Sequence, residues 1–239
     1  GPGKIGLRYA IDLSGAALGC LLCIPLLDVL SGPSVVLFAG LLGFAAAGLF
    51  HLAQPLRAPL RLFHLLPVLT TLAIIHADST TPFSFHLLNV KSREASMVGT
   101  EYSRWNSFSE ISITPLMRME PFFWDAGAGA PQTFQNQRFL LIDGMAGTPM
   151  YEFDGDYRKP DFLRYDITNL AYNIRHEGRA AIIGVGGGRD ILAARHFGFQ
   201  DVTAVELNPI IINLLTTTTP YKDFANLAQD PAIHLHVDD

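Results

Sequence analysis

Residues 179–190 of this chain read RAAIIGVGGGRD. The four residues after Arg179 are apolar and end in two isoleucines, which is typical of a buried strand. Gly184 then permits a tight strand-to-helix turn, while Gly186 and Gly188 allow a ligand to approach the backbone without a Cβ in the way. The helix expected after this turn offers unpaired N–H groups and a partial positive charge, which suit a pyrophosphate or a carboxylate.

Strands and helices continue to alternate after the glycine turn. The expected elements are a helix at 191–197, a strand at 201–205, a helix from Pro209 and a strand at 233–237. This βαβαβ order implies a parallel sheet with right-handed crossovers. We therefore predict that residues 159–239 form a Rossmann-like, nucleoside-binding α/β domain that is truncated at its C-terminus.

Acidic residues follow the second and third expected strands. Glu206 lies eighteen residues beyond Gly188, where a carboxylate accepts both hydroxyls of an adenosine ribose. Asp238 and Asp239 follow the third strand, where an acid would approach the adenine, and this favours S-adenosylmethionine over a dinucleotide. The predicted cofactor-binding residues are Gly184, Gly186, Gly187, Gly188, Glu206, Asp238 and Asp239. All lie at the carboxyl edge of the predicted sheet, where open α/β folds bind ligands.

Charge divides the chain into two parts. Residues 1–77 hold four basic and two acidic side chains, whereas residues 78–239 hold 13 basic and 20 acidic ones. With 49% hydrophobic and 16% charged residues, the whole is too apolar for an ordinary soluble protein. Two cysteines exclude a disulfide scaffold, and the apolar content excludes disorder. The acidic balance of the larger part argues against nucleic-acid binding.

We predict that residues 1–77 form a membrane-spanning region whose partner is the lipid bilayer. Its long uncharged runs place spans at 9–30 and 34–53, and a third segment at 58–77 could span the bilayer or lie along its surface. The chain begins without a methionine and ends directly after a strand, so both ends are expected to be internal to a longer protein.

Basic residues suggest an orientation for this region. If Lys4 and Arg8 mark the cytoplasmic side, two crossings return Arg57 and Arg61 to that side, as the positive-inside rule favours. A third span would then place the polar domain outside. We therefore favour two spans, with a third segment that is re-entrant, interfacial or paired with a further span, and on this interpretation the polar domain is cytoplasmic.

Residues 78–158 are predicted to be a linker and a small β-rich element. Residues 105–113 alternate between apolar and polar side chains, and residues 138–142 form a short β-rich run that ends in the turn signal Asp143-Gly144. Residues 161–176 have approximate helical spacing. The histidines have no metal-site companions at a recognised spacing, so no metal is expected.

Several of these motifs resemble those of the spermidine/spermine synthase family. GVGGG at 184–188, VELNP at 205–209 and VDD at 237–239 resemble its nucleoside-binding motifs. WNSFSEISI at 105–113 and LIDG at 141–144 resemble its N-terminal β-domain. The apolar stretch 8–22 is similar to bacterial membrane proteins that fuse several spans to such a domain.

The resemblance implies a fold, a co-substrate and partners. The expected fold is a set of transmembrane α-helices followed by an α/β Rossmann-like, class I methyltransferase-type domain with a small N-terminal β-element. The implied co-substrate is S-adenosylmethionine or its decarboxylated form, and the implied partners are a small amine acceptor and a second copy in a homodimer. The implied location is a multi-pass protein of the bacterial inner membrane.

The amine-binding pattern of the family is matched poorly. An aspartate inside the family's glycine run is replaced by Gly187, a Tyr-Gln pair becomes Phe108-Ser109, and the family's catalytic aspartate would lie beyond residue 239. A cationic amine needs carboxylates to pair its charge. The substrate-binding candidates are Ser109, Asp143, Asp166 and Asp190.

Three function classes follow, of which a dinucleotide oxidoreductase is the third and is disfavoured by the placement of Asp238 and Asp239. The first is a membrane-anchored transferase that moves an aminopropyl or methyl group to an amine. The second is a membrane transport or scaffold protein whose nucleoside-binding domain senses a ligand without turning it over, and the missing amine-holding residues motivate it.

Overall fold

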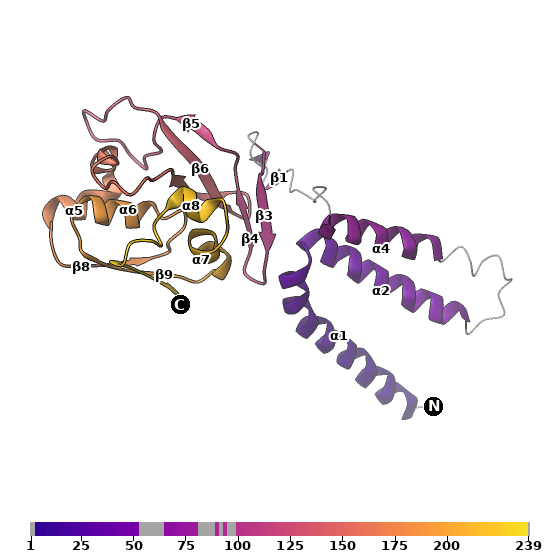
Figure 1. The fold of residues 1–239 in the computed structure, drawn as a ribbon. Helices are drawn as coiled ribbons and strands as arrows, with labels where there is room; N and C mark the ends of the chain where they lie inside the picture. The colour runs from indigo at the N-terminus through magenta and orange to yellow at the C-terminus, as the bar shows by residue number, and fades with distance from the viewer. Residues whose placement is uncertain (1–2, 53–64, 81–88, 91–92, 95–98, 239) are drawn as a thin grey trace. The chain divides into compact units, whose positions relative to one another are not determined.

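A computed structural model of the chain describes residues 3–52, 65–80, 89–90, 93–94 and 99–238 (Figure 1). The chain divides into two compact units. The first comprises Gly1–Leu88 and Arg104–Glu110, and the second comprises Asn89–Ser103 and Ile111–Asp239.

The first unit contains the helices α1 (Gly3–Val29), α2 (Gly32–Leu52) and α4 (Leu65–Thr80). Two segments, Lys4–Val29 and Gly32–Phe50, are long and apolar enough to cross a membrane, although a signal sequence or a core helix passes the same test. At about 1.5 Å per residue, even the shorter segment approaches the roughly 30 Å of a bilayer core.

The predicted spans fall largely on these helices. The spans 9–30 and 34–53 lie on α1 and α2, except that residue 30 is a bend after α1 and residue 53 is outside the described residues. Of the third segment, 58–77, residues 65–77 lie in α4 and residues 58–64 are outside the described residues.

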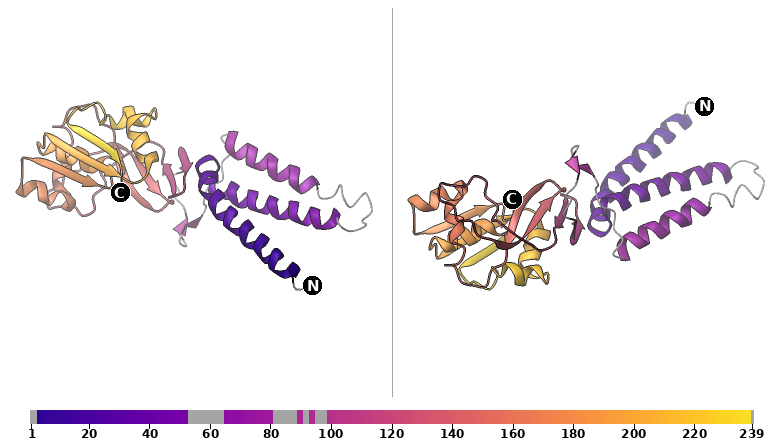
Figure 2. Two further views of the ribbon diagram at one scale, coloured as in Figure 1. Left: turned by 90° about the horizontal axis from the view of Figure 1, so that it is seen from below. Right: turned by 90° about the horizontal axis from the view of Figure 1, so that it is seen from above.

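Helices α2 and α4 lie side by side (Figures 1 and 2). The hydroxyls of Ser31 and Ser34 each donate a hydrogen bond of 2.5 Å to Oδ2 of Asp78. The Asp78 carboxylate is thereby held at the N-terminus of α2, where a helix favours negative charge. The end of α4 consequently lies beside the start of α2, and the two helices run in opposite directions.

The second unit begins with β-structure. The two short strands β1 (Asn89–Val90) and β2 (Arg93–Glu94) pair with each other. A five-stranded sheet follows in the order β3-β4-β6-β5, with β7 also paired to β6. Its strands are β3 (Tyr102–Trp105), β4 (Glu110–Ile113), β5 (Met117–Met119), β6 (Gln135–Ile142) and β7 (Ala146–Tyr151). These strands lie within residues 78–158, where a linker and a small β-rich element were predicted.

Two local details differ from the predictions. The alternating stretch 105–113 is a strand end, a turn and a second strand, because the side chain of Asn106 accepts the N–H groups of Phe108 and Ser109. Residues 161–176 do not form one helix. They form the 3-10 turns η1 (Asp161–Tyr165) and η2 (Ile167–Asn169), followed by a short α5 (Leu170–Ile174).

Asp166 is the physical reason for the broken helix. Its backbone is extended, and its side chain accepts hydrogen bonds from both the N–H and the hydroxyl of Thr168. These bonds start a new turn in place of a continuous helix.

The α/β part has the predicted order of strands and helices, with one further short helix, α8, that was not predicted. Its elements are β8 (Arg179–Ile183), α6 (Arg189–His196), β9 (Asp201–Glu206), α7 (Pro209–Thr216), α8 (Tyr221–Ala225) and β10 (Ile233–Val237). The three strands are parallel in the order β10-β9-β8, and α6 and α7 lie on one face of the sheet (Figure 1). The predicted βαβαβ unit is confirmed.

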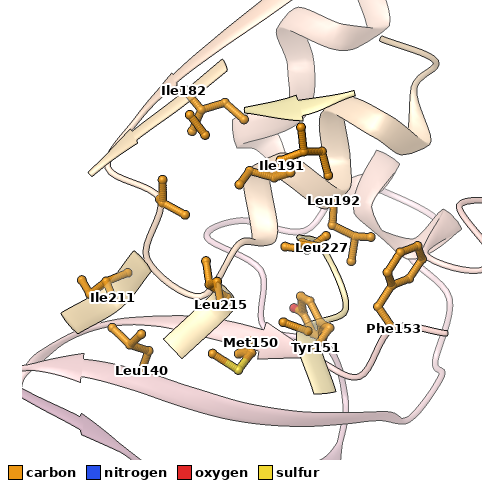
Figure 3. Packing of buried hydrophobic residues seen from close by; sticks show 14 of the residues in the cluster. Leu140, Met150, Tyr151, Phe153, Ile182, Ile191, Leu192, Ile211, Leu215 and Leu227 are labelled. Carbon is orange, nitrogen blue, oxygen red and sulfur yellow. The ribbon is translucent and has the colours of Figure 1, made fainter. Parts of the chain in front are cut away.

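One hydrophobic core joins the β-element to the α/β part (Figure 3). Met150 of β7, Ile191 of α6 and Leu215 of α7 are each fully buried in it. Burying each such side chain contributes roughly 1.5–3 kcal/mol. The other face of the parallel sheet is more open, since the side chain of Ile183 is 92% exposed.

Candidate nucleoside site

The site is built at the carboxyl edge of the parallel sheet. The N–H of Gly184 bonds to the carbonyl of Val205 at 2.9 Å, and the N–H of Asp238 bonds to the carbonyl of Glu206 at 3.2 Å. These bonds bring three of the predicted residues, Gly184, Glu206 and Asp238, to the ends of adjacent strands. Asp239 lies outside the described residues.

The carboxylate of Glu206 is held by the backbone. The residue is 8% exposed. Its Oε2 accepts the N–H of Gly186 at 3.2 Å, and its Oε1 accepts the N–H of Asn208 at 3.1 Å. A carboxylate has about four lone-pair sites, so each oxygen retains capacity for one more donor, such as a ribose hydroxyl. Glu206 is therefore fixed in orientation without being saturated.

Three of the four glycines in the turn are packed against other parts of the chain. A Cβ placed on Gly186 would lie 2.5 Å from Cγ2 of Thr148, one on Gly187 would lie 2.4 Å from the carbonyl oxygen of Pro149, and one on Gly188 would lie 2.4 Å from Cδ1 of Leu227. The space that Gly186 and Gly188 were expected to leave for a ligand is therefore filled by the protein itself. Glycine is required at these positions for internal packing.

Gly184 is different from the other three. It is exposed, its φ is +82°, and a Cβ there would meet nothing within 4 Å. Gly184 is therefore the glycine of this turn that leaves open space beside its backbone.

The close approach at Gly187 also bears on amine binding. The family pattern places an aspartate at this position, and the backbone of Pro149 leaves no room here for any side chain. The packing of β7 against the turn therefore excludes an aspartate at position 187.

Asp166 is engaged in a buried ion pair. Its Oδ2 lies 2.5 Å from Nη2 of Arg189, and the two side chains are 0% and 4% exposed. Arg189 also contacts Asp190 through Nη1 at 2.7 Å and Thr168 through Nη2 at 2.7 Å. A buried ion pair of this kind is stable only while both charges are present. The structure gives Asp166 a structural role and leaves it no exposed atom for an amine.

Tyr151 lies close to this ion pair. Its hydroxyl donates to the carbonyl of Phe122 at 3.1 Å. Burial raises the pKa of Tyr151, and the nearby Arg189 opposes this rise without cancelling it. The phenol therefore remains a neutral hydrogen-bond donor.

The other substrate candidates, Asp190, Asp143 and Ser109, belong to three different turns or helices of the chain. Asp190 is in the first turn of α6, its side chain is 46% exposed, and it is paired with Arg189. Asp143 occupies the turn between β6 and β7 with a φ of +50°, which confirms the predicted turn signal. Ser109 ends the turn from Asn106 and belongs to the first compact unit.

Two residues of the site were not predicted. Asn208 accepts the N–H of Ile210 and donates its own N–H to Glu206. The Asn208-Pro209 pair, an N-cap followed by proline as the first residue of α7, is a helix-start signal that could have identified it. Thr148 accepts the N–H of Gly187 at 2.9 Å. No local signal points to Thr148, because it lies 39 residues before the glycine that it contacts.

Two cavities of the second unit, of about 320 and 400 Å³, are not lined by Gly184 or Glu206. Within the described residues, no group of three or more His, Cys, Asp or Glu side chains could hold a metal ion.

Comparison with known proteins finds similar solved structures but no matching family model or curated protein. Among solved structures, the chain is similar to spermidine synthase from Thermotoga maritima, with 16% identity and a TM-score of 0.36. It is also similar to a spermidine synthase in complex with the transition-state analogue AdoDATO, with 16% identity and a TM-score of 0.35.

Both matches cover 59% of this chain and 41% of the other chain. The chain therefore spans less than half the length of these spermidine synthases. A likeness at this TM-score does not assign a family, and the fold assignment rests on the parallel strand order and crossovers described above.

Proposed function

We propose that this chain is part of a membrane-anchored transferase of the spermidine synthase type. In this proposal the α/β domain binds S-adenosylmethionine or decarboxylated S-adenosylmethionine, and an aminopropyl or methyl group passes to a small amine. The observation that carries the proposal is the Glu206 carboxylate, which the backbone fixes at the edge of the sheet beside Gly184 and Asp238.

The residues of this edge have distinct tasks in the proposal. Glu206 accepts the ribose hydroxyls, Asp238 and Asp239 approach the adenine, and Gly184 leaves the backbone accessible. The sulfonium group of the co-substrate supplies an electrophilic carbon, whose bond to sulfur breaks as the amine nitrogen bonds to it. Holding the two reactants in line is the main contribution of the protein. The base that takes the amine proton is expected beyond residue 239.

The amine would be bound differently from the family pattern. Asp166 is buried in its ion pair, and Gly187 cannot carry a side chain. Asp190 and Asp143 are the acids that remain exposed among the candidates, and Ser109 is retained as a candidate of the first unit.

The proposed partners are the lipid bilayer, the amine and a second copy of the chain, and nucleic acid is not among them. The proposed location is a bacterial inner membrane, with α1 and α2 as spans and the domain on the cytoplasmic side.

Calorimetry of the full chain in detergent, with each nucleoside in turn, tests the proposal. We expect binding that weakens at least tenfold in Glu206→Gln, because the variant loses charge-assisted bonds to the ribose. Asp201→Asn is the matched control, since Asp201 stands at the opposite end of the same strand. If the unaltered chain binds neither nucleoside, the proposal is contradicted.

The sensing protein is the second candidate, and one observation favours it. The packing at Gly187 and the burial of Asp166 remove two carboxylates that an amine would need. This candidate predicts nucleoside binding without a product. Incubation with a radiolabelled donor and a panel of diamines distinguishes the two, because any labelled amine product excludes a pure sensor.

A further inference from the structure

We propose that Thr148, in the N-terminal β-element, is a positioning residue for the nucleoside site, acting on Glu206 through the glycine turn. The inference rests on the proposed function, because it concerns the same site. It assigns to β7 a role in donor binding that sequence motifs alone did not indicate.

The first step is a pair of consecutive hydrogen bonds. The N–H of Gly186 donates to Oε2 of Glu206 at 3.2 Å, and the next N–H along the chain, that of Gly187, donates to Oγ1 of Thr148 at 2.9 Å. Two adjacent peptide groups are therefore fixed by two different side chains. The orientation of the first peptide determines the direction of the bond to Glu206, and the bond to Thr148 restrains the second.

The second step is steric. The methyl group of Thr148 fills the space beside Gly186, where a Cβ would lie 2.5 Å from Cγ2 and 3.0 Å from Oγ1 of Thr148. Gly186 has a φ of +52°, so the turn depends on glycine here for both its conformation and its packing. A run of three glycines has many accessible conformations. Contact with Thr148 selects one of them before a ligand arrives.

The third step connects this restraint to affinity. A site that is ordered before binding loses less conformational freedom when the ligand binds. If Oγ1 of Thr148 is removed, the Gly187 N–H is left without its acceptor and the turn is released. The carboxylate of Glu206 then loses its fixed direction, although no atom of Glu206 has changed.

Two substitutions distinguish the effect of the Thr148 hydroxyl from the effect of the size of its side chain. Thr148→Val keeps the size and removes the acceptor, whereas Thr148→Ser keeps the acceptor. We expect Thr148→Val to bind S-adenosylmethionine and its decarboxylated form about tenfold more weakly, while Thr148→Ser stays within about threefold of the unaltered chain. Ile113→Val is the control for general loss of stability, since Ile113 is 1% exposed in β4. This control should lower the melting temperature and leave the affinity unchanged.

A second measurement does not need a ligand. Hydrogen exchange of the peptide covering residues 184–190 should be faster in Thr148→Val than in the unaltered chain or in Thr148→Ser. If the unaltered chain binds neither nucleoside, the proposed function fails while this exchange measurement still tests the restraint. Should Thr148→Val not fold, Thr148→Ala takes its place against Thr148→Ser in both measurements.

The inference is overturned by either of two results. One is equal nucleoside affinity in Thr148→Val and the unaltered chain. The other is unchanged exchange at residues 184–190 in Thr148→Val.

Discussion

At Gly187 a single added carbon would meet the backbone of another strand. A Cβ there would lie 2.4 Å from the carbonyl oxygen of Pro149, whereas one on Gly184 would meet nothing within 4 Å. We expect Gly187→Ala to lower the free energy of unfolding by about 2–3 kcal/mol, because backbone must move to relieve the overlap.

Gly184→Ala is the matched comparison. Its φ of +82° is unfavourable for alanine, and this strain should cost about 1 kcal/mol. Urea unfolding of the full chain in detergent, followed by tryptophan fluorescence, gives both values. Equal losses in the two variants would contradict the packing described for Gly187.

Asp230 provides a pH-dependent contribution to stability. Its carboxylate accepts the hydroxyl of Tyr157 at 2.5 Å and Nε of Arg195 at 2.8 Å. Burial by itself raises the pKa of Asp230, but the hydrogen bonds from Tyr157, the Ala232 N–H and Arg195 outweigh burial, so the pKa is lowered. Burial and the bond to Asp230 raise the pKa of Tyr157 to about 12.

The sign of the effect follows from the lowered pKa. The stabilisation is complete above the unfolded pKa of about 3.9 and is lost as the pH falls through the folded pKa. We expect Asp230→Asn to be less stable than the unaltered chain at pH 7, and to lose less stability between pH 5 and pH 2.5. Urea unfolding at a series of pH values measures this, and parallel curves for the two proteins would be evidence against it.

Among the elements, η2 and α6 are joined at their starts, because Asp166, the residue that caps η2, forms a buried ion pair with Arg189, the first residue of α6. Removing one partner leaves an uncompensated buried charge, so Asp166→Leu or Arg189→Met alone should lower stability by about 3–5 kcal/mol. The double variant should lose clearly less than the sum of the two single losses. A double-mutant cycle by urea unfolding measures the difference, and additive losses would show that the pair is not coupled.

The same elements show what sequence can and cannot predict. The strand, turn and helix order from Arg179 to Val237 was predicted because each step has a local signal: glycines at the turn, Pro209 at a helix start and short apolar runs for strands. The broken helix at Asp166 was missed because approximate helical spacing does not show that the local bonds from Thr168 start a new turn, nor that tertiary contacts hold the carboxylate there. The carboxylate bonds to Thr168, to the N–H of Trp124 and to Arg189, of which two are distant in sequence.

The site shows the same division. Gly184, Glu206 and Asp238 were placed together correctly, since parallel strands must end at one edge. The packing of Thr148 and Pro149 on the turn was not predicted, because β7 is brought there by the shared core and not by any nearby motif.

At the scale of the whole molecule, the hydrogen bond from Ser31 to Asp78 fixes the relative direction of α2 and α4. It places the end of α4 at the level where α2 begins. If α1 and α2 cross a bilayer, cysteines introduced at Val29 and Thr80 should react with an impermeant thiol reagent from the same side, and one at Lys4 from the opposite side. The measurement uses intact spheroplasts and inverted vesicles, with Cys20 and Cys23 replaced by alanine.

This experiment also tests the proposed cytoplasmic domain. The basic residues Lys4 and Arg8 favour a cytoplasmic start of α1, whereas a domain that uses a soluble nucleoside must face the cell interior. Because the end of α4 lies beside the start of α2, a cytoplasmic Lys4 puts Thr80 on the periplasmic side. The positive-inside rule therefore argues against the cytoplasmic location proposed for the domain. Labelling of Thr80→Cys from the periplasmic side would remove the cytoplasmic location, and labelling of Val29→Cys and Thr80→Cys from different sides would contradict the pairing of α4 with α2.

The packing of the glycine turn also has a consequence for unfolding. Gly186 and Gly187 are covered by β7, Gly188 is covered by Leu227, and the core beneath them is shared. Neither the β-element nor the parallel sheet can therefore lose its structure while the other keeps it. The two should melt in a single cooperative transition, and a protease that cuts the chain near Arg158 should release no stable half.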